Sequence, residues 1–90
     1  MKRKKYVEVF ERVIGAGVNP KVEQKGRVLR IWYPVTSWVK IDRRDTAMVE
    51  GLLLERQLPY VDFYWFVEKY HYNMLRFGLA IILPRGVEVE

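Results

Sequence analysis

The spacing of apolar residues near the start of the chain predicts a helix over residues 3–14. The apolar positions recur at intervals of three and four, namely Tyr6, Val9, Phe10 and Val13. This spacing gathers them on one helical face, and Gly15 follows as a residue type that commonly ends a helix. Alternation of valines over residues 7–13 leaves a strand as the alternative, but the length of the pattern and the trailing glycines favour the helix.

Residues 21–33 carry the next signal, which is that of a β-strand. From residue 28 onward the two faces alternate, and β-branched and aromatic side chains dominate. The more apolar set, which we expect to face the core, is Leu29, Ile31 and Tyr33. Gly26 indicates a turn or a bulge, and Pro34 ends or bends the strand. Residues 35–41 form either a second short strand or one helical turn.

The second half of the chain predicts a helix followed by a long hairpin. Residues 46–58 have helical apolar spacing, with Asp45 as the N-cap and a proline as the stop. Residues 60–70 and 75–83 then form two antiparallel strands joined by a His-Tyr-Asn turn. This order predicts one α+β domain over the whole chain, residues 1–90, with two helices packed on one face of an antiparallel sheet.

Composition limits the classes of protein to which the chain can belong. Of its 90 residues 50% are hydrophobic and 30% charged, which excludes intrinsic disorder, and no apolar run approaches the ~18 residues that span a bilayer. Cysteine is absent and Ser, Thr, Asn and Gln are few, a bias typical of hyperthermophile proteins. The basic residues 1–5 form a flexible arm or a solvated terminus. No apolar stretch follows them, so we expect a cytoplasmic protein without a signal peptide.

Positive charge is concentrated in the first half of the chain. Twelve of the sixteen Lys and Arg residues stand within residues 1–45, a polarity that attracts polyanions. The candidate nucleic-acid-binding residues on and after the predicted strand are Lys21, Lys25, Arg27, Arg30, Lys40, Arg43 and Arg44. Arg30 shares the outward strand face with Trp32, which is a candidate stacking ring. The alternative is a solvated strand face on which a helix or a second subunit covers Trp32.

Catalytic chemistry has little support in the sequence. Ser37 lies in no glycine-flanked nucleophile context, and His71 has no partner at metal-ligand spacing. Residues 15–17, Gly-Ala-Gly, lack the preceding strand and the further glycine of a dinucleotide site. We therefore expect a protein that is not an enzyme, with no cofactor, no metal and no small-molecule substrate. Catalytic function remains an alternative only if His71 lies in a cleft beside a carboxylate.

The aromatic run in the predicted hairpin has apolar side chains on both faces. In a strand, Phe63, Trp65 and Val67 point one way, while Tyr64 and Phe66 point the other. A strand of this kind is usually covered on both sides, and a chain this short has little with which to cover both. We therefore expect a homodimer in which a partner supplies one cover. This favours, as the alternative function, a structural or interaction protein that forms an oligomer through its aromatic hairpin.

Part of residues 26–50 resembles a known family. The Gly-Arg-Val-Leu-Arg-Ile-Trp-Tyr-Pro run at its start is similar to the first strand of archaeal AbrB/SpoVT-like transcription factors. Asp45 and the pair Val49-Glu50 stand where that family opens its next strand. The resemblance implies a dimeric swapped-hairpin β-barrel that binds DNA through Arg27 and Arg30. It therefore favours DNA over RNA and a regulatory protein of an archaeon, or of one of its viruses or plasmids, and makes the barrel the alternative fold.

Overall fold

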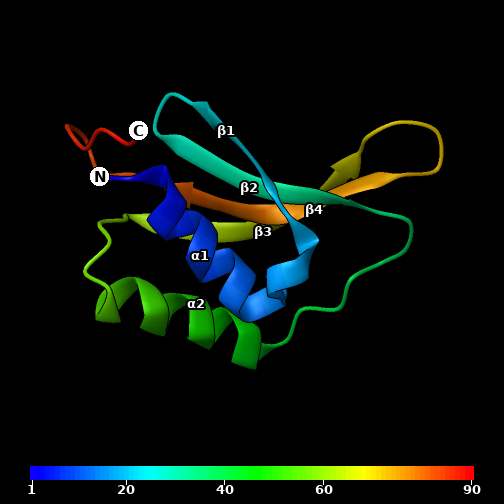
Figure 1. Cartoon of the computed structure of the whole chain (residues 1–90), viewed down its shortest axis with the longest axis horizontal. Coiled ribbons are helices and arrows are strands. Elements are labelled where there is room, and N and C mark those ends of the chain that lie inside the picture. The colour runs from blue at the N-terminus through cyan, green and yellow to red at the C-terminus, as the bar shows by residue number, and fades with distance from the viewer.

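A computed structural model describes residues 1–90, the whole chain. Each half of the chain contributes one α-helix followed by a β-hairpin, as Figure 1 shows. The elements in order are α1 (Arg3–Ile14), the 3₁₀ turn η1 (Ala16–Val18), β1 (Lys21–Lys25), β2 (Val28–Val35), α2 (Arg43–Glu55), β3 (Asp62–Lys69) and β4 (Leu75–Ile82). No helix of the fold is both long enough and apolar enough to cross a bilayer.

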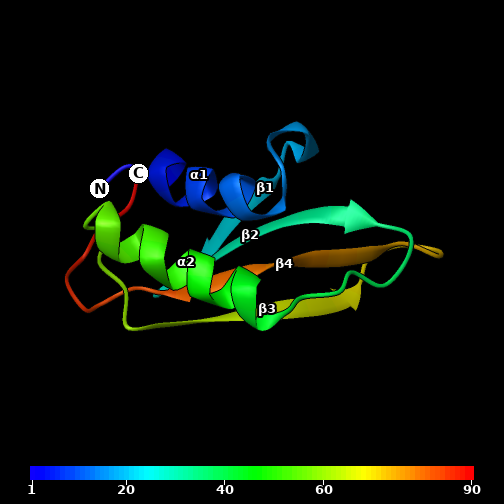
Figure 2. The same ribbon diagram turned by 90° about the horizontal axis from the view of Figure 1, so that it is seen from below.

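The four strands form one antiparallel sheet in the order β1-β2-β4-β3. The two hairpins lie side by side, and their inner strands β2 and β4 pair along their whole length. Figure 2 shows both helices on the same face of this sheet. The predicted α+β fold is therefore confirmed. The swapped-hairpin barrel is wrong because the sheet stays open, with β1 and β3 as its free edges, and because residues 43–55 are helical.

The core lies between the helices and the sheet, on the side to which the alternation assigned Leu29, Ile31 and the half-buried Tyr33. Leu29 and Ile31 of β2 are fully buried, together with Phe77, Leu79 and Ile81 of β4. The helices close the core with the apolar stripe Tyr6, Val9 and Phe10 of α1 and with Val49 and Leu53 of α2. Burial of these side chains is the main favourable contribution to the stability of so small a domain.

Two features of the first hairpin refine the sequence prediction. Gly26 forms the turn between β1 and β2, where its φ of 58° lies in the region that favours glycine. Strand β2 runs through Pro34 to Val35 instead of ending at the proline. This is possible because β1 begins at Lys21, opposite Trp32, and so does not reach Pro34. Pro34 therefore pairs only with β4, and the backbone N–H that proline lacks is not needed on the other side. Residues 36–42 are a loop, neither strand nor helical turn.

The start of α2 lies three residues before the predicted one. Asp42, not Asp45, is the N-cap, because its carboxylate accepts hydrogen bonds from the backbone N–H groups of Arg44 and Asp45 at 2.8 and 3.1 Å. The Asp45 carboxylate in turn accepts from the backbone N–H of Asp42, which completes a capping box. The pKa of Asp42 is lowered, chiefly by the hydrogen bond from the Asp45 N–H. The backbone N–H and the positive charge of Arg44 lower it further. The helix ends before Gln57, whose φ of 54° breaks it.

The hydroxyl group of Tyr6 ties α1 to the segment that connects α2 and β3. Tyr6 donates a hydrogen bond of 2.7 Å to the carbonyl oxygen of Pro59. Burial raises the pKa of this tyrosine, because the neutral form is the one that the apolar surroundings favour. On the second half of the chain, Trp65 of β3 donates from its indole N–H to the hydroxyl of Thr46 in α2 at 3.1 Å. Each helix is thus fixed by a polar contact as well as by apolar packing.

Candidate nucleic-acid interface

The sheet face turned away from the helices, called the open face below, receives alternate side chains from all four strands. Because opposite residues of an antiparallel pair share a face, the strand register defines this surface. Its central members are Glu23 of β1, Arg30 and Trp32 of β2, Arg76, Gly78 and Ala80 of β4, and Tyr64, Phe66 and Glu68 of β3. No helix of the chain covers them (Figure 2).

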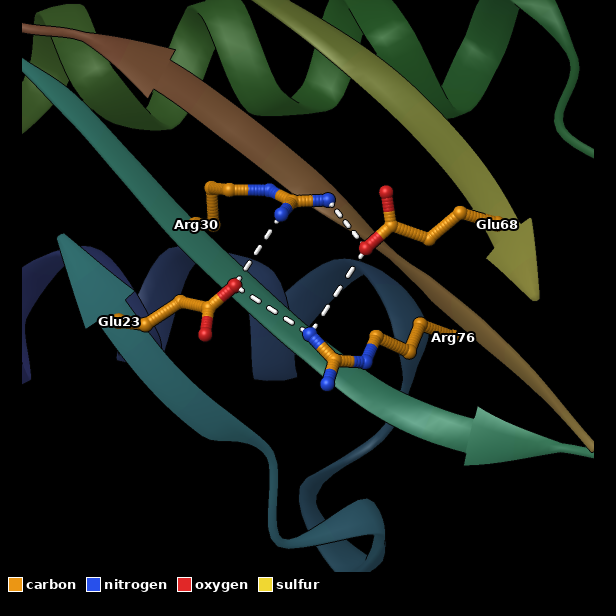
Figure 3. Close-up of polar contacts among 4 residues, drawn as sticks. All are labelled: Glu23, Arg30, Glu68 and Arg76. Atoms are coloured by element: carbon orange, nitrogen blue, oxygen red, sulfur yellow. Dashed lines mark hydrogen bonds and ion pairs between the residues drawn. The ribbon is translucent and has the colours of Figure 1, made fainter. Parts of the chain in front are cut away.

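Four charged side chains, one from each strand, form a closed ring on the open face (Figure 3). Arg30 contacts Glu23 at 3.1 Å and Glu68 at 2.8 Å. Arg76 contacts the same two carboxylates at 3.5 and 3.7 Å. Glu23 lies opposite Arg30, and Glu68 opposite Arg76, so each hairpin supplies one cation and one anion. The charge ring is therefore neutral, and it joins the two hairpins across the β2–β4 boundary.

The two guanidinium groups of the charge ring also lie on aromatic rings. The guanidinium carbon of Arg30 is 4.1 Å from the centroid of the Phe66 ring. That of Arg76 is 4.3 Å from Trp32 and 4.8 Å from Tyr70. These are distances at which the positive group is attracted to the ring face. The side chains of Arg30 and Arg76 remain 15% and 26% exposed, so part of each still meets solvent.

Gly78 makes this arrangement possible in the centre of the sheet. A Cβ atom at this position would lie 2.2 Å from the carbonyl oxygen of Ile31 and 2.6 Å from the Cβ of Trp32. Trp32 is opposite Gly78 in the register, so its large side chain rests where the glycine leaves room. The neighbouring open-face position on β4 is the small Ala80, which separates Arg30 from Tyr64. Glycine inside a strand is typical of such close approach.

The predicted cations are divided between the two sides of the sheet. Lys21 and Lys25 lie exposed on the open face of the edge strand β1, and Arg27 lies exposed in the adjoining turn. The Nε of Arg27 donates to the carbonyl oxygen of Leu83 at 2.9 Å. Arg30 is in the charge ring, so its charge is already balanced by two carboxylates.

Of the other three predicted cations, Arg43 and Arg44 lie in the helix layer. Lys40 belongs to the loop that carries the chain from β2 to the helix layer, and Arg43 and Arg44 form the first turn of α2. The seven predicted cations therefore do not form a single basic patch. The physical reason is the loop of residues 36–42, which carries the chain from the sheet to the helix layer (Figure 2).

Trp32 is not the exposed ring that the alternation indicated. Its side chain is on the predicted face but only 4% exposed, because Arg76 and Tyr70 lie against it. Trp32 is covered, but by side chains of the same sheet and not by the helix or second subunit of the alternative. The ring that does meet solvent on this face is Tyr64, which is 49% exposed.

The sequence pattern did not single out Glu23, Glu68 or Arg76, and it placed Tyr64 in an aromatic run expected to be covered on both faces. The one available signal was Arg76, a lone cation in the otherwise apolar run of residues 75–83. Its carboxylate partners come from other strands, so the pairing required the register. His71 lies where it was predicted, in the exposed turn between β3 and β4, stacked on Tyr70 with 3.9 Å between ring centroids.

The basic N-terminal residues lie apart from the open face. Residues 3–5 belong to α1, and Arg3 donates its backbone N–H to the carbonyl oxygen of Glu90 at 2.8 Å. Around the start of α1 the exposed cations Lys2, Lys4 and Lys5 surround a shallow depression together with Arg56 and Glu8. Arg56 pairs with Glu8 at 3.6 Å, which balances part of this charge.

Comparison with known proteins finds no counterpart for this chain: no family model, no curated protein and no solved structure matches it.

Proposed function

We propose that the chain binds single-stranded nucleic acid across the open face of its sheet. The observation that carries the proposal is the combination of a half-exposed ring, Tyr64, with two guanidinium groups held over neighbouring rings, on a face that no helix covers. Aromatic and guanidinium planes on the open face of a four-stranded sheet are a recurrent means of stacking unpaired bases.

In this proposal one set of residues stacks bases and another set contacts the phosphates. Bases would stack on Tyr64 and on the exposed sides of Arg30 and Arg76, whose planes the charge ring fixes in place. The phosphates would contact Lys21, Lys25 and Arg27, which lie along the rim formed by β1 and its turn. Three phosphate contacts to a single strand give a shallow salt dependence, with a slope of about −2 in log affinity against log salt.

A single strand fits this surface better than a duplex does. The rings and guanidinium groups present flat faces, and base faces are available only where bases are unstacked. The sequence-based preference for DNA remains part of the proposal. It is tested by comparing a DNA oligonucleotide with an RNA of the same sequence, because the 2′-hydroxyl is the group that distinguishes them.

Fluorescence anisotropy with a labelled single-stranded oligonucleotide, at two salt concentrations, tests the proposal. We expect Tyr64→Ala to weaken binding roughly ten-fold or more, the usual effect of losing one stacked ring. Removing two cations from the open face, Lys21→Ala with Lys25→Ala, should weaken binding and reduce the magnitude of the salt slope by about 1.4.

The matched control removes two cations from the opposite side, Arg43→Ala with Arg44→Ala, and should leave affinity nearly unchanged. Absence of binding at low salt would reject the proposal. Equal losses from the two pairs of substitutions would also reject it, because binding would then follow net charge and not the open face.

The alternative function, assembly without nucleic acid, is favoured by one further observation. Strand β3 is a free edge of the sheet, and apolar side chains lie along it. A chain that self-associates through this edge yet ignores oligonucleotides at low salt would favour an interaction protein over a nucleic-acid-binding one.

A further inference from the structure

The two free edges of the sheet differ in how well they are protected against pairing with another strand. β1 is short, follows Pro20, and places the charged Lys21, Glu23 and Lys25 on one face. Short length, lysines and a nearby proline are the usual protections of an edge. β3 has eight residues and no proline, and its middle five residues, 63–67, are all apolar. Apart from the N–H of Phe63, which donates to the Asp62 carboxylate at 2.8 Å, its outer backbone groups are free to pair.

An apolar groove runs beside the unprotected edge. Trp38, Val39 and Ile41 of the loop after β2 form one wall, and Trp65 and Val67 of β3 lie in the other. Trp38 is 77% exposed, a large fraction for an indole ring. Exposed apolar surface next to an unpaired strand is typical of an interaction site.

We propose that β3 pairs antiparallel with β3 of a second copy of this chain, with Phe66 opposite the partner's Phe66. A two-fold axis perpendicular to the sheet would relate the two copies, and their sheets would become one sheet of about eight strands. The proposal does not rest on nucleic-acid binding, although it would place both open faces on the same side.

The register follows from strand length, side-chain parity and charge. A two-fold axis of this kind places residues of the same face opposite each other, so the axis passes through a residue and not between two residues. Of the possible positions, an axis at Trp65 or at Phe66 pairs the largest number of β3 residues with β3 of the second copy. The axis at Trp65 would place Asp62 opposite the partner's Glu68 at both ends, and opposed like charges are destabilising.

The axis at Phe66 avoids every like-charge pair within the strand. It places Tyr64 opposite the partner's Glu68 and Phe63 opposite the partner's Lys69, while Trp65 meets the partner's Val67. A phenol can donate to a carboxylate, and a lysine side chain can cover an aromatic ring. Because one strand satisfies these conditions against itself, a second copy is the partner that the charges favour.

The absence of cysteine from the chain permits a direct test by cross-linking. In the proposed register the Cα atoms of residue 66 in the two copies are about 4.5–5.5 Å apart, within the range of a disulfide. Phe66→Cys should therefore form a covalent dimer under mild oxidation. The matched control Tyr64→Cys should stay monomeric on a non-reducing gel, because its two copies lie four residues apart along the strand, about 13 Å. Equal cross-linking of the two variants would overturn the register.

A second pair of variants tests the register without removing the ring beneath Arg30. Analytical ultracentrifugation of the unmodified protein should show a dimer in equilibrium with the 10.8 kDa monomer. Tyr64→Glu, which sets two carboxylates against the partner's Glu68, should raise the dimer Kd roughly ten-fold. Tyr64→Lys, which sets an opposite charge there, should change it less than about two-fold. A protein that stays monomeric at millimolar concentration, or equal effects of the two substitutions, would reject the proposal, whatever the outcome of the oligonucleotide titrations.

Discussion

Gly78 determines the packing of the open face, because it has no side chain. Trp32 occupies the space over Gly78, and Arg76 then lies on the indole ring. A larger residue at position 78 would meet the backbone of β2, which cannot move aside without disturbing the β2–β4 pairing. The packing of the open face therefore begins with a glycine in the central part of the sheet.

We expect Gly78→Ala to lower the free energy of unfolding by about 1–3 kcal/mol, the usual cost of overpacking an interior site. Gly51→Ala is the matched control, because Gly51 lies exposed inside α2 with no neighbour near the added methyl group. Alanine there should raise stability by about 0.5–1 kcal/mol. Urea denaturation of the two variants measures both changes, and a loss of stability at position 51 similar to that at position 78 would contradict this account.

The sequence predicted the face on which a side chain lies, because the local pattern determines it. It did not predict the contacts of that side chain with residues distant in the sequence. The alternation of β2 correctly placed Leu29 and Ile31 in the core and Arg30 on the opposite face. The neutralisation of Arg30 depends on Glu68, which reaches it only through the register of two further strands. Exposure of a charge or a ring is set by such contacts between strands, so the sequence pattern gave the face but not the accessibility.

At the scale of elements, capping fixes where α2 begins. The apolar spacing that starts at residue 46 predicted Asp45 as the cap. The structure uses Asp42 as the cap and Asp45 as its reciprocal partner, which adds a first turn of charged residues to the helix. Helix existence was predictable from periodicity, whereas its first turn depended on which carboxylate accepts the backbone N–H groups.

The lowered pKa of Asp42 predicts how this helix responds to acid. The carboxylate is held ionised in the folded state, so its contribution to stability is present above its unfolded pKa and is lost as the pH falls through its folded pKa. Asp42→Ala should therefore destabilise the protein at pH 7, and the difference from the unmodified protein should shrink toward pH 2. Urea midpoints measured across this range give the comparison.

Asp42→Asn provides the control for this prediction, because asparagine still caps the helix but does not titrate. It should retain part of the stability at neutral pH and should lack the acid-dependent loss contributed by this position. An alanine variant whose deficit is the same at pH 2 and pH 7 would show that the Asp42 charge does not stabilise the helix start.

At the scale of the whole molecule, the charge ring contributes to the joining of the two halves of the chain. Its individual ion pairs are partly exposed, and such pairs are worth little alone. Together they span all four strands, and Arg30, the least exposed member, depends on two carboxylates. Networks of this kind matter more at high temperature, because the cost of desolvating charges falls.

We expect Glu68→Gln to lower the thermal midpoint by a few degrees, corresponding to roughly 0.5–1 kcal/mol. The loss should decrease in 1 M NaCl, where charges are screened over about 3 Å. Glu50→Gln, on the exposed side of α2 and outside every ion pair, is the control and should change stability by less than about 0.5 kcal/mol. Calorimetry at low and high salt distinguishes the two. Equal shifts would mean that the ring contributes nothing beyond net charge.

The overall architecture was more predictable than the surface. The order of elements predicted the layers, because two amphipathic helices and a set of antiparallel strands have few ways to share one core. The hairpin of β3 and β4 was visible in the run of aromatic and aliphatic residues around a polar turn. The strand order was not visible, because nothing local decides that β4 inserts between β2 and β3. The open face, and every pair on it, follows from that insertion.

The two halves of the chain are built alike, so the chain can be divided between them. Each half holds a helix, a hairpin, part of the apolar interior, and one cation with one anion of the ring. Cleavage in the loop of residues 36–42 would leave two fragments of similar plan whose charges and apolar surfaces complement each other. The seam between β2 and β4 is therefore a natural place for fragment complementation, with reassembly that weakens as salt is added.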